Sequence, residues 1–421
     1  MATAFVGATV IDGKDGVARD GLAVVIDGET ITSVVAASAI PQSASRVDVT
    51  GRTIMPGVID THTHFAAWAQ WLISRQQDRL MYLAAKTISG LGRTLARGVT
   101  TARDMGGLDA GFVQAIEDGI VAGPRLQTAV VILHPTNGLN DNIPGLGGLV
   151  SPQGQMLQLP GFPDPHCDGP IEARKKVRET LRAGADLIKI AATSATVGRV
   201  ADWTVPSFTI EEIKAIVDEA HGVGVAVHSH AMGPVGAARS VEAGVDSIEH
   251  GSLIDDRTIE AMAKNGTWLV PMFWILKFHA EHDPTPEARE SAKKLLETTV
   301  DTFRRARAAG VRIAMASDAG PELDTDGSAS FVEMGYMVDA GMTPGEAIVA
   351  ATRSAAECMR IDDKVGTLET GKYADLLVLD GNPLDDVSVL ANEARLEMVI
   401  KSGELVGGTR FAPIARDLNE S

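Results

Sequence analysis

The sequence predicts an α/β protein, a (β/α)8 TIM barrel with a small β-sandwich domain formed by both termini. The centre of the 421-residue chain alternates strand-like apolar segments with helical ones. Both ends instead carry short strand-like runs separated by turns, and a barrel of roughly 250 residues leaves these ends for a smaller unit. We therefore expect residues 1–55 and 366–421 to form the sandwich and residues 56–365 to form the barrel.

The terminal segments have the pattern of β-hairpins. Near the N-terminus, Asp27-Gly28 separates the apolar runs Ala23–Ile26 and Ile31–Val35, and an Asp-Gly pair between strand-like runs predicts a hairpin. The C-terminal part has the same pattern: the strand-like runs Asp375–Asp380 and Met398–Lys401 are separated by turn residues. Both ends of the chain are therefore expected to be β-structure.

The central part contains eight candidate barrel strands. They are Ile54–Asp60, Val99–Asp104, Arg125–Val131, Ala185–Ala191, Gly224–His230, Val245–His250, Trp268–Met272 and Arg312–Asp318. Helix signals lie between or after them: Thr209 and Glu212 form a capping box, as do Thr343 and Glu346, and Pro170 opens another helix. Eight strands alternating with helices predict a barrel whose chemistry lies at the C-terminal ends of the strands.

One long loop is expected over the mouth of this barrel. Residues 138–170 contain seven Gly and six Pro, a composition typical of a loop. A loop of this length in a compact domain is usually functional, so we expect it to influence substrate choice. A surface excursion or an oligomer contact is the alternative.

Composition excludes several classes of protein. The net charge of −17 disfavours a nucleic-acid partner, and no apolar run approaches the ~18 residues needed to span a bilayer. Cys167 and Cys358 are too few for a disulfide framework and are expected to be free thiols. The first residues do not form a signal peptide, so the expected location is cytoplasmic if the chain is complete, and periplasmic or secreted if a leader was removed.

Two features of the predicted strands suggest metal chemistry. His62 and His64 follow an apolar strand and point to one face of it, where two imidazoles can share a metal ion. Lys189 lies in an almost wholly apolar strand, and burial favours its neutral amine, which can react with carbon dioxide to give an anionic carbamate ligand. Taken singly, each feature has an ordinary alternative, such as a core histidine or an ion pair between Lys189 and a carboxylate.

Further candidates end other strands. His230 ends the fifth strand, with His228 a layer deeper, while His250 ends the sixth and Asp318 the eighth. Imidazoles and a carboxylate collected at one end of a barrel suit Zn²⁺ in a catalytic site that keeps a position for water.

The chain resembles the amidohydrolase superfamily, and within it the imidazolonepropionase-like and Xaa-Pro dipeptidase-type subgroup, which includes enzymes that cleave ochratoxin A. The resemblance rests on residues 55–64, 98–104, 184–190, 225–230, 248–251, 317–320, 366–379 and 382–384. It implies a small-molecule amide substrate and a homo-oligomer.

The resemblance also implies a site with two divalent metal ions, most often zinc. The resemblance assigns His62 and His64 to one ion and His230 and His250 to the other. It also implies that Lys189 is carboxylated and bridges the two ions. Asp318 is implied to bind the first ion and the bridging hydroxide. Relatives often carry Gly-Gly-His after the third strand, where this chain has Leu133-His134-Pro135. His134 and His228 are therefore weak candidates for substrate contacts.

The expected activity is hydrolysis of the amide bond of N-acyl amino acids or dipeptides. Ochratoxin A, which would release phenylalanine, belongs to this class. Asp318 is the expected catalytic residue, taking a proton as water attacks and giving it to the leaving amine. Hydrolysis of a cyclic amide, or deamination, is the alternative enzyme activity. A metal-free structural protein on the same fold is a third possibility, against which the presence of all six candidate ligands argues.

Overall fold

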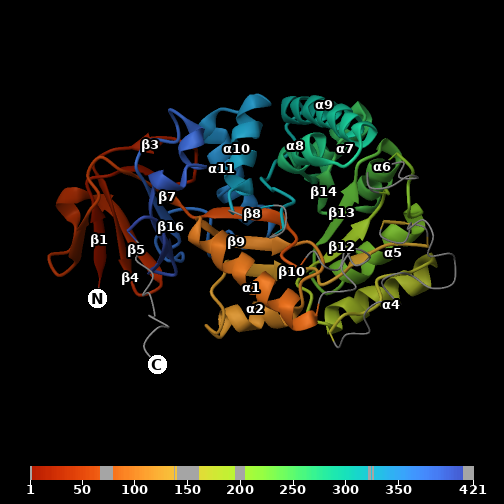
Figure 1. Cartoon of the computed structure of the whole chain (residues 1–421), viewed down its shortest axis with the longest axis horizontal. Coiled ribbons are helices and arrows are strands. Elements are labelled where there is room, and N and C mark those ends of the chain that lie inside the picture. The colour runs from red at the N-terminus through yellow and green to blue at the C-terminus, as the bar shows by residue number, and fades with distance from the viewer. Residues whose placement is uncertain are drawn as a thin grey trace.

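The protein is a ring of parallel strands wrapped by helices, beside two sheets built from the chain ends (Figure 1). The structure is a computed structural model, and it describes residues 2–66, 79–136, 138–139, 161–194, 204–320, 324 and 327–410. The predicted α/β barrel with a terminal β-sandwich is confirmed.

The terminal sheets contain four and six strands, in the orders β5-β4-β1-β6 and β18-β17-β16-β7-β2-β3. Their bounds are β1 (Thr3–Val6), β2 (Thr9–Ile11), β3 (Ala18–Arg19), β4 (Leu22–Asp27), β5 (Thr30–Ala36), β6 (Ser45–Asp48), β7 (Thr53–Pro56), β16 (Leu376–Leu379), β17 (Leu396–Lys401) and β18 (Glu404–Gly407). The predicted hairpin is present, because β4 and β5 pair antiparallel up to Asp27 and Thr30. The larger sheet joins strands from both ends of the chain, whose red and blue ribbons lie side by side in Figure 1.

The barrel strands pair in parallel. They are β8 (Val58–Thr63), β9 (Val99–Asp104), β10 (Arg125–Thr128), β11 (Ile132–Leu133), β12 (Ile188–Ala191), β13 (Val227–Ala231), β14 (Ser247–His250) and β15 (Trp268–Val270). The third predicted strand, Arg125–Val131, ends earlier than expected, because β10 stops at Thr128. A separate strand beyond it, β11, pairs with β12 and not with β9.

Residues 312–319 take the place of the eighth barrel strand, although they do not form a regular strand. Single-residue parallel bridges join Ile313 to Leu269 of β15 and Ala319 to Thr63 of β8. In addition, the backbone N–H of Asp318 donates to the carbonyl of His62 at 2.9 Å. The segment therefore closes the ring between the seventh strand and the first.

The prediction of a single barrel strand over Ile54–Asp60 is wrong. The segment is divided between two sheets: β7 pairs with β16, whereas β8 pairs with β9. Pro56 has no N–H to donate, and the N–H of Gly57 bonds to the carbonyl of Asp375 in the terminal domain. The change of sheet therefore occurs between Pro56 and Val58. The expected domain boundaries remain a prediction.

Gly57→Ala should lower the free energy of unfolding by about 1–3 kcal/mol, the usual cost of overpacking. A Cβ at Gly57 would lie 2.1 Å from Oγ1 and 2.8 Å from Cβ of Thr100, so this backbone would have to move. Urea unfolding measures the change. Gly335→Ala is the matched control, because a Cβ there meets nothing within 4 Å and the residue lies inside a helix. Equal stability of both variants would contradict the close packing at Gly57.

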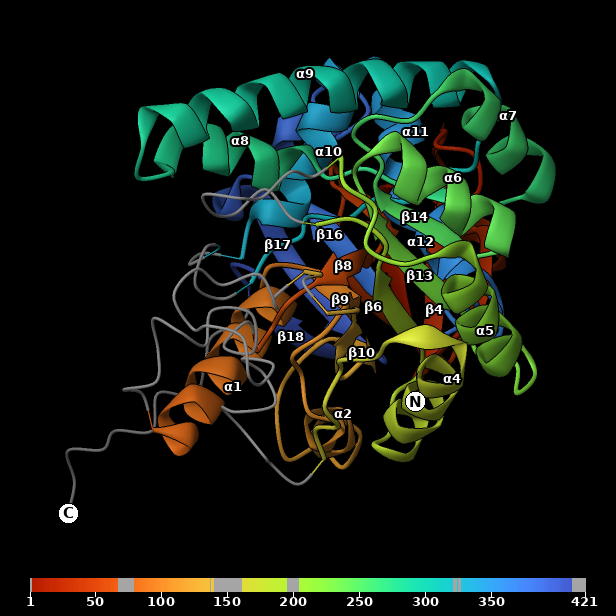
Figure 2. The ribbon, with the colours of Figure 1, turned by 90° about the vertical axis from the view of Figure 1, so that its right-hand side faces the viewer.

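Helices surround the barrel strands (Figure 2). Their bounds are α1 (Leu80–Ala96), α2 (Ala110–Glu117), α4 (Gly169–Arg182), α5 (Ile210–His221), α6 (Pro234–Ala243), α7 (Asp256–Asn265), α8 (Phe273–His282), α9 (Pro286–Ala308), α10 (Ala329–Asp339), α11 (Pro344–Ala350) and α12 (Arg353–Cys358). Both predicted capping boxes are formed, at Thr209 before α5 and at Thr343 before α11, and Pro170 lies in the first turn of α4.

Within the described residues, no helix is both long enough and apolar enough to cross a membrane. Residues 140–160, which make up most of the Gly- and Pro-rich segment 138–170, lie outside the described part of the chain. The influence of this segment on substrate choice therefore remains a prediction.

Candidate metal centre

Three of the predicted ligands meet at the end of the first strand. Nε2 of His62 lies 3.4 Å from Oδ1 of Asp318, and Nε2 of His64 lies 3.2 Å from the same oxygen. One ligand atom from each residue lies within 4.8 Å of the others, a spacing that can hold a metal ion. His62 lies on β8 and His64 follows directly after it, and the hydrogen bond from Asp318 N–H to the carbonyl of His62 brings the carboxylate beside them.

The opposite nitrogens of the two rings are anchored. Nδ1 of His62 lies 2.6 Å from Oε2 of Glu249, and Nδ1 of His64 lies 2.9 Å from the carbonyl oxygen of Gly106. An oxygen partner on one ring nitrogen leaves the other directed at a metal, which is the usual arrangement of metal-binding histidines.

His230 and His250 form a second pair beside the first. Their ring centroids are 4.5 Å apart, and His250 also lies 5.4 Å from the ring of His62. Nε2 of His230 and Nδ1 of His250 are buried, and neither has a hydrogen-bond partner in the described part of the chain. Burial lowers the pKa of His230 well below its usual range and that of His250 to about 4, so both rings are neutral and can donate a lone pair to a cation.

Lys189 lies on β12, next to β13, which carries His230, and is only 1% exposed. Its Nζ has no hydrogen-bond partner among the described residues. Burial lowers the pKa of its ammonium group to about 8, against the opposing effect of Glu249 and Asp318. The alternative reading, an ion pair between Lys189 and a carboxylate, is therefore not a close contact here. A substantial neutral fraction at physiological pH suits the carbamate chemistry expected from the sequence.

The neighbouring histidines determine the ionisation of Asp318. Burial alone would raise the pKa of this carboxyl, but the imidazoles of His62, His64 and His250 lower it overall, so Asp318 is ionised. Burial opposes protonation of His64, yet its hydrogen bond to Asp318 raises its pKa. The carboxylate of Asp318 therefore favours a positive charge beside it, on His64 or on a bound cation.

The backbone at two candidate ligands is unusual. Asp318 has φ = 57° and His250 has φ = 69°, in the left-handed region that side chains other than glycine rarely adopt. Strain of this kind is typical of functional sites, where the surrounding structure holds it in place.

Comparison with known proteins agrees with this geometry. Residues 53–406 match the model of the amidohydrolase family. The chain belongs to the amidohydrolase family. Its candidate metal site is the group His62, His64 and Asp318, as expected of a metal-dependent hydrolase.

Three relatives align with most of the length of this amidohydrolase. The ochratoxinase of Aspergillus niger is 30% identical over 424 residues, covering 96% of this chain and 86% of that protein. Its crystal structure has a TM-score of 0.87 at 28% identity and covers 99% and 98% of the two chains. A prolidase complexed with N-methylphosphonate-L-proline has a TM-score of 0.86 at 33% identity, covering 97% and 100%. The imidazolonepropionase of Micrococcus luteus is 26% identical over 414 residues, covering 88% and 90%.

The two weaker candidates of this amidohydrolase, His228 and His134, do not belong to the group His62, His64 and Asp318. His228 pairs in register with Lys189, two residues deeper than His230, and its Nδ1 lies 2.7 Å from Oγ of Ser247. His134 is buried at the end of β11, where its backbone bridges to His166. Their expected contacts with substrate remain predictions.

Sequence reasoning missed a layer of buried polar residues under the site. Arg103 of β9 donates from Nε to the carbonyl of Thr61 at 2.6 Å, and its Nη2 lies 3.4 Å from Oε1 of Glu249. Asp60 accepts from the hydroxyl groups of Ser317 and Ser330 at 2.6 and 2.7 Å. A signal was present, because Arg103 is a basic residue inside a predicted barrel strand, as Lys189 is.

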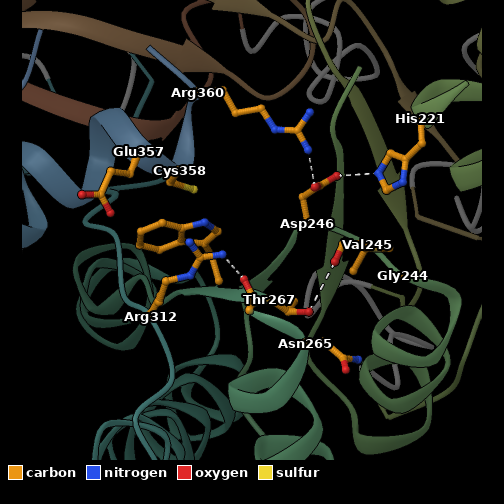
Figure 3. A pocket seen from close by; sticks show the side chains of 12 residues that line it. His221, Gly244, Val245, Asp246, Asn265, Thr267, Arg312, Glu357, Cys358 and Arg360 are labelled. Atoms are coloured by element: carbon orange, nitrogen blue, oxygen red, sulfur yellow. Dashed lines mark hydrogen bonds and ion pairs between the residues drawn. The ribbon is translucent and has the colours of Figure 1, made fainter. Parts of the chain in front are cut away.

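A pocket of about 450 Å³ lies at the opposite end of the barrel, at the N-terminal ends of β14 and β15 (Figure 3). Asp246 accepts from Arg360 Nη2 at 2.5 Å and lies 2.9 Å from Nε2 of His221. Arg312 donates to the carbonyl of Gly266 and stacks on Trp268 at 4.3 Å. Each of these charged groups is paired with another group of the protein. We therefore interpret them as stabilising the base of the barrel.

Proposed function

We propose that this amidohydrolase uses two divalent ions, zinc in the first instance, to hydrolyse the amide bond of N-acyl amino acids or dipeptides. The observation that carries the proposal is the group His62, His64 and Asp318, together with three further candidate ligands, His230, His250 and Lys189, whose buried nitrogens have no hydrogen-bond partner among the described residues. Six ligands exceed the four that one tetrahedral zinc ion takes.

The ligands divide into two groups in this proposal. His62, His64 and Asp318 hold the first ion, since their ligand atoms already lie within 4.8 Å of one another. His230 and His250 hold the second. Lys189, as a carbamate, would supply anionic oxygen ligands, which is supported by its buried Nζ without a hydrogen-bond partner among the described residues.

Bound metal ions lower the pKa of a water molecule and polarise the amide carbonyl. Asp318 takes the proton of the attacking water, because its carboxylate is ionised and lies at the meeting point of the ligands. It then gives the proton to the nitrogen of the leaving group. This second transfer matters because an unprotonated amine is a poor leaving group.

The substrate class is supported by what the relatives are named for. Ochratoxinase and prolidase both match over nearly the full chain. Ochratoxin A is therefore one candidate substrate, and dipeptides ending in proline are another. Hydrolysis of a cyclic amide is the second candidate function, supported by the imidazolonepropionase relative at lower identity.

We expect the purified protein to contain about two divalent ions per chain and to release free amino acid from at least one member of a substrate panel. The panel comprises N-acyl amino acids, dipeptides with and without proline, ochratoxin A and an imidazolone. Elemental analysis measures the metal, and activity should disappear with chelation and return with added Zn²⁺. His62→Ala should lose metal and activity together. An active preparation without metal would contradict the proposal, and turnover of the imidazolone alone would favour the second function.

A further inference from the structure

We propose that Glu249 is a positioning residue that fixes the tautomer of His62, so that Nε2 of this ring carries the lone pair directed at the metal. Arg103 and Ser247 hold Glu249 in the orientation that makes this selection. The proposal rests on the proposed function only in assigning a metal to His62.

The contacts of Glu249 divide cleanly between its two oxygens. The side chain is completely buried on β14. Oε2 lies 2.6 Å from Nδ1 of His62. Oε1 accepts from the hydroxyl group of Ser247 and lies 3.4 Å from Nη2 of Arg103.

Arg103 is itself held from several sides. Its Nε donates to the carbonyl of Thr61, one residue before His62, and its Nη1 lies 3.2 Å from Nε2 of His228. Sγ of Cys358 lies 3.9 Å from Nη1, on the side of the pocket shown in Figure 3. The guanidinium is thus fixed in place and supplies the positive charge that a buried carboxylate requires.

The geometry determines which nitrogen of His62 carries the proton. A carboxylate offers only acceptors, so the short contact with Oε2 requires a proton on Nδ1. Nε2 is then an acceptor facing Oδ1 of Asp318 at 3.4 Å. Two acceptor atoms at this separation repel each other unless a cation lies between them, which is the arrangement of two ligands of one metal ion.

Replacing Glu249 with glutamine should reverse this selection. Ser247 and Arg103 both donate toward the position of Oε1, so the amide oxygen should take that position. The amide NH₂ then faces Nδ1 of His62. Nδ1 must become the acceptor, and the proton moves to Nε2, where it blocks the metal.

The tautomer can be measured directly by ¹⁵N NMR on metal-free protein labelled at histidine. The His62 signals are identified by their absence from His62→Ala. We expect wild-type protein to carry the proton on Nδ1 and Glu249→Gln to carry it on Nε2. Competition with a chelator should show that Glu249→Gln binds the metal held by His62 about 10–100-fold more weakly, the usual loss for such a partner.

Glu212→Gln is the matched control. Glu212 is also a buried carboxylate, but its oxygens accept from the backbone N–H groups of Gly169 and Thr209, and it does not contact the candidate ligands. This variant should keep both the metal affinity and the tautomer of His62. An equal loss of metal in both variants would overturn the proposal, since it would trace the effect to removal of a buried charge in general.

The wild-type spectrum keeps the proposal testable even if Glu249→Gln does not fold. A His62 ring with its proton on Nε2 in the metal-free wild type would overturn it. The same holds if the variant folds and binds metal as tightly as wild type. Failure of every substrate in the panel would contradict the proposed function alone, because the tautomer is read without substrate.

Discussion

Asp318→Asn should lower kcat on an amide substrate by at least about 10²–10⁴-fold, the contribution usual for a positioned proton-transfer group. Asparagine is nearly the same size and keeps a carbonyl oxygen near His62 and His64, so much of the metal should remain bound. The amide cannot accept a proton from water and return it to the leaving amine. Steady-state kinetics with kcat normalised to measured metal content give the effect.

A matched pair of substrates separates proton transfer from metal binding. An ester or anilide has a leaving group that needs less protonation, so the loss in Asp318→Asn should be smaller on it than on the corresponding amide. Losses that are equal on both substrates and follow the metal content would make Asp318 a ligand only. His228 would then be the next candidate for the proton transfer.

Lys189→Ala should lower kcat by more than about 100-fold, beyond the loss typical of an outer-shell partner of a metal. The variant removes the group proposed to bridge the two ions and leaves a cavity where the buried side chain was. A short carboxylic acid such as acetate or propionate should fill this space, supply bridging oxygens and restore part of the activity. Metal content and kcat are measured with and without the acid.

Two further variants test the identity of the bridge. Lys189→Arg should be as inactive as Lys189→Ala, because a guanidinium cannot ligate a cation. Lys176→Ala is the control, since Lys176 is also buried but pairs with Glu179 at 3.2 Å on α4. Lys176→Ala should keep its activity and not respond to the acid. Full activity of Lys189→Arg would exclude the carbamate, and an increase in the activity of Lys176→Ala on adding acid would show that the effect of the acid is unspecific.

The barrel and the position of its candidate ligands could be predicted from local patterns. Residues at strand ends, such as His62 and His250, are visible in the sequence because each lies at or just after the end of a predicted strand. Capping boxes at Thr209 and Thr343 depend on residues three apart and were equally visible. These features need no knowledge of distant neighbours.

Features that depend on distant partners were not predictable in the same way. The apolar run Ile54–Asp60 looks like one strand, and its division follows from the contact between Gly57 and Asp375. Likewise, Glu249 looks like an ordinary charge next to His250 until the fold brings His62 and Arg103 to its two oxygens.

The pairing of β7 with β16 has a consequence for the order in which the protein matures. Pro56 pairs with Leu376, so β7 cannot pair with β16 until more than 300 further residues have been synthesised. His62 and His64 follow directly from this strand, and Asp318, their partner, is also made late. Long-range pairing of this kind delays folding and leaves one edge of β7 unpaired meanwhile, although the other edge can already pair with β2. We therefore expect metal loading to follow completion of the C-terminal strands, and nascent chains that end before residue 376 to bind no metal at this site.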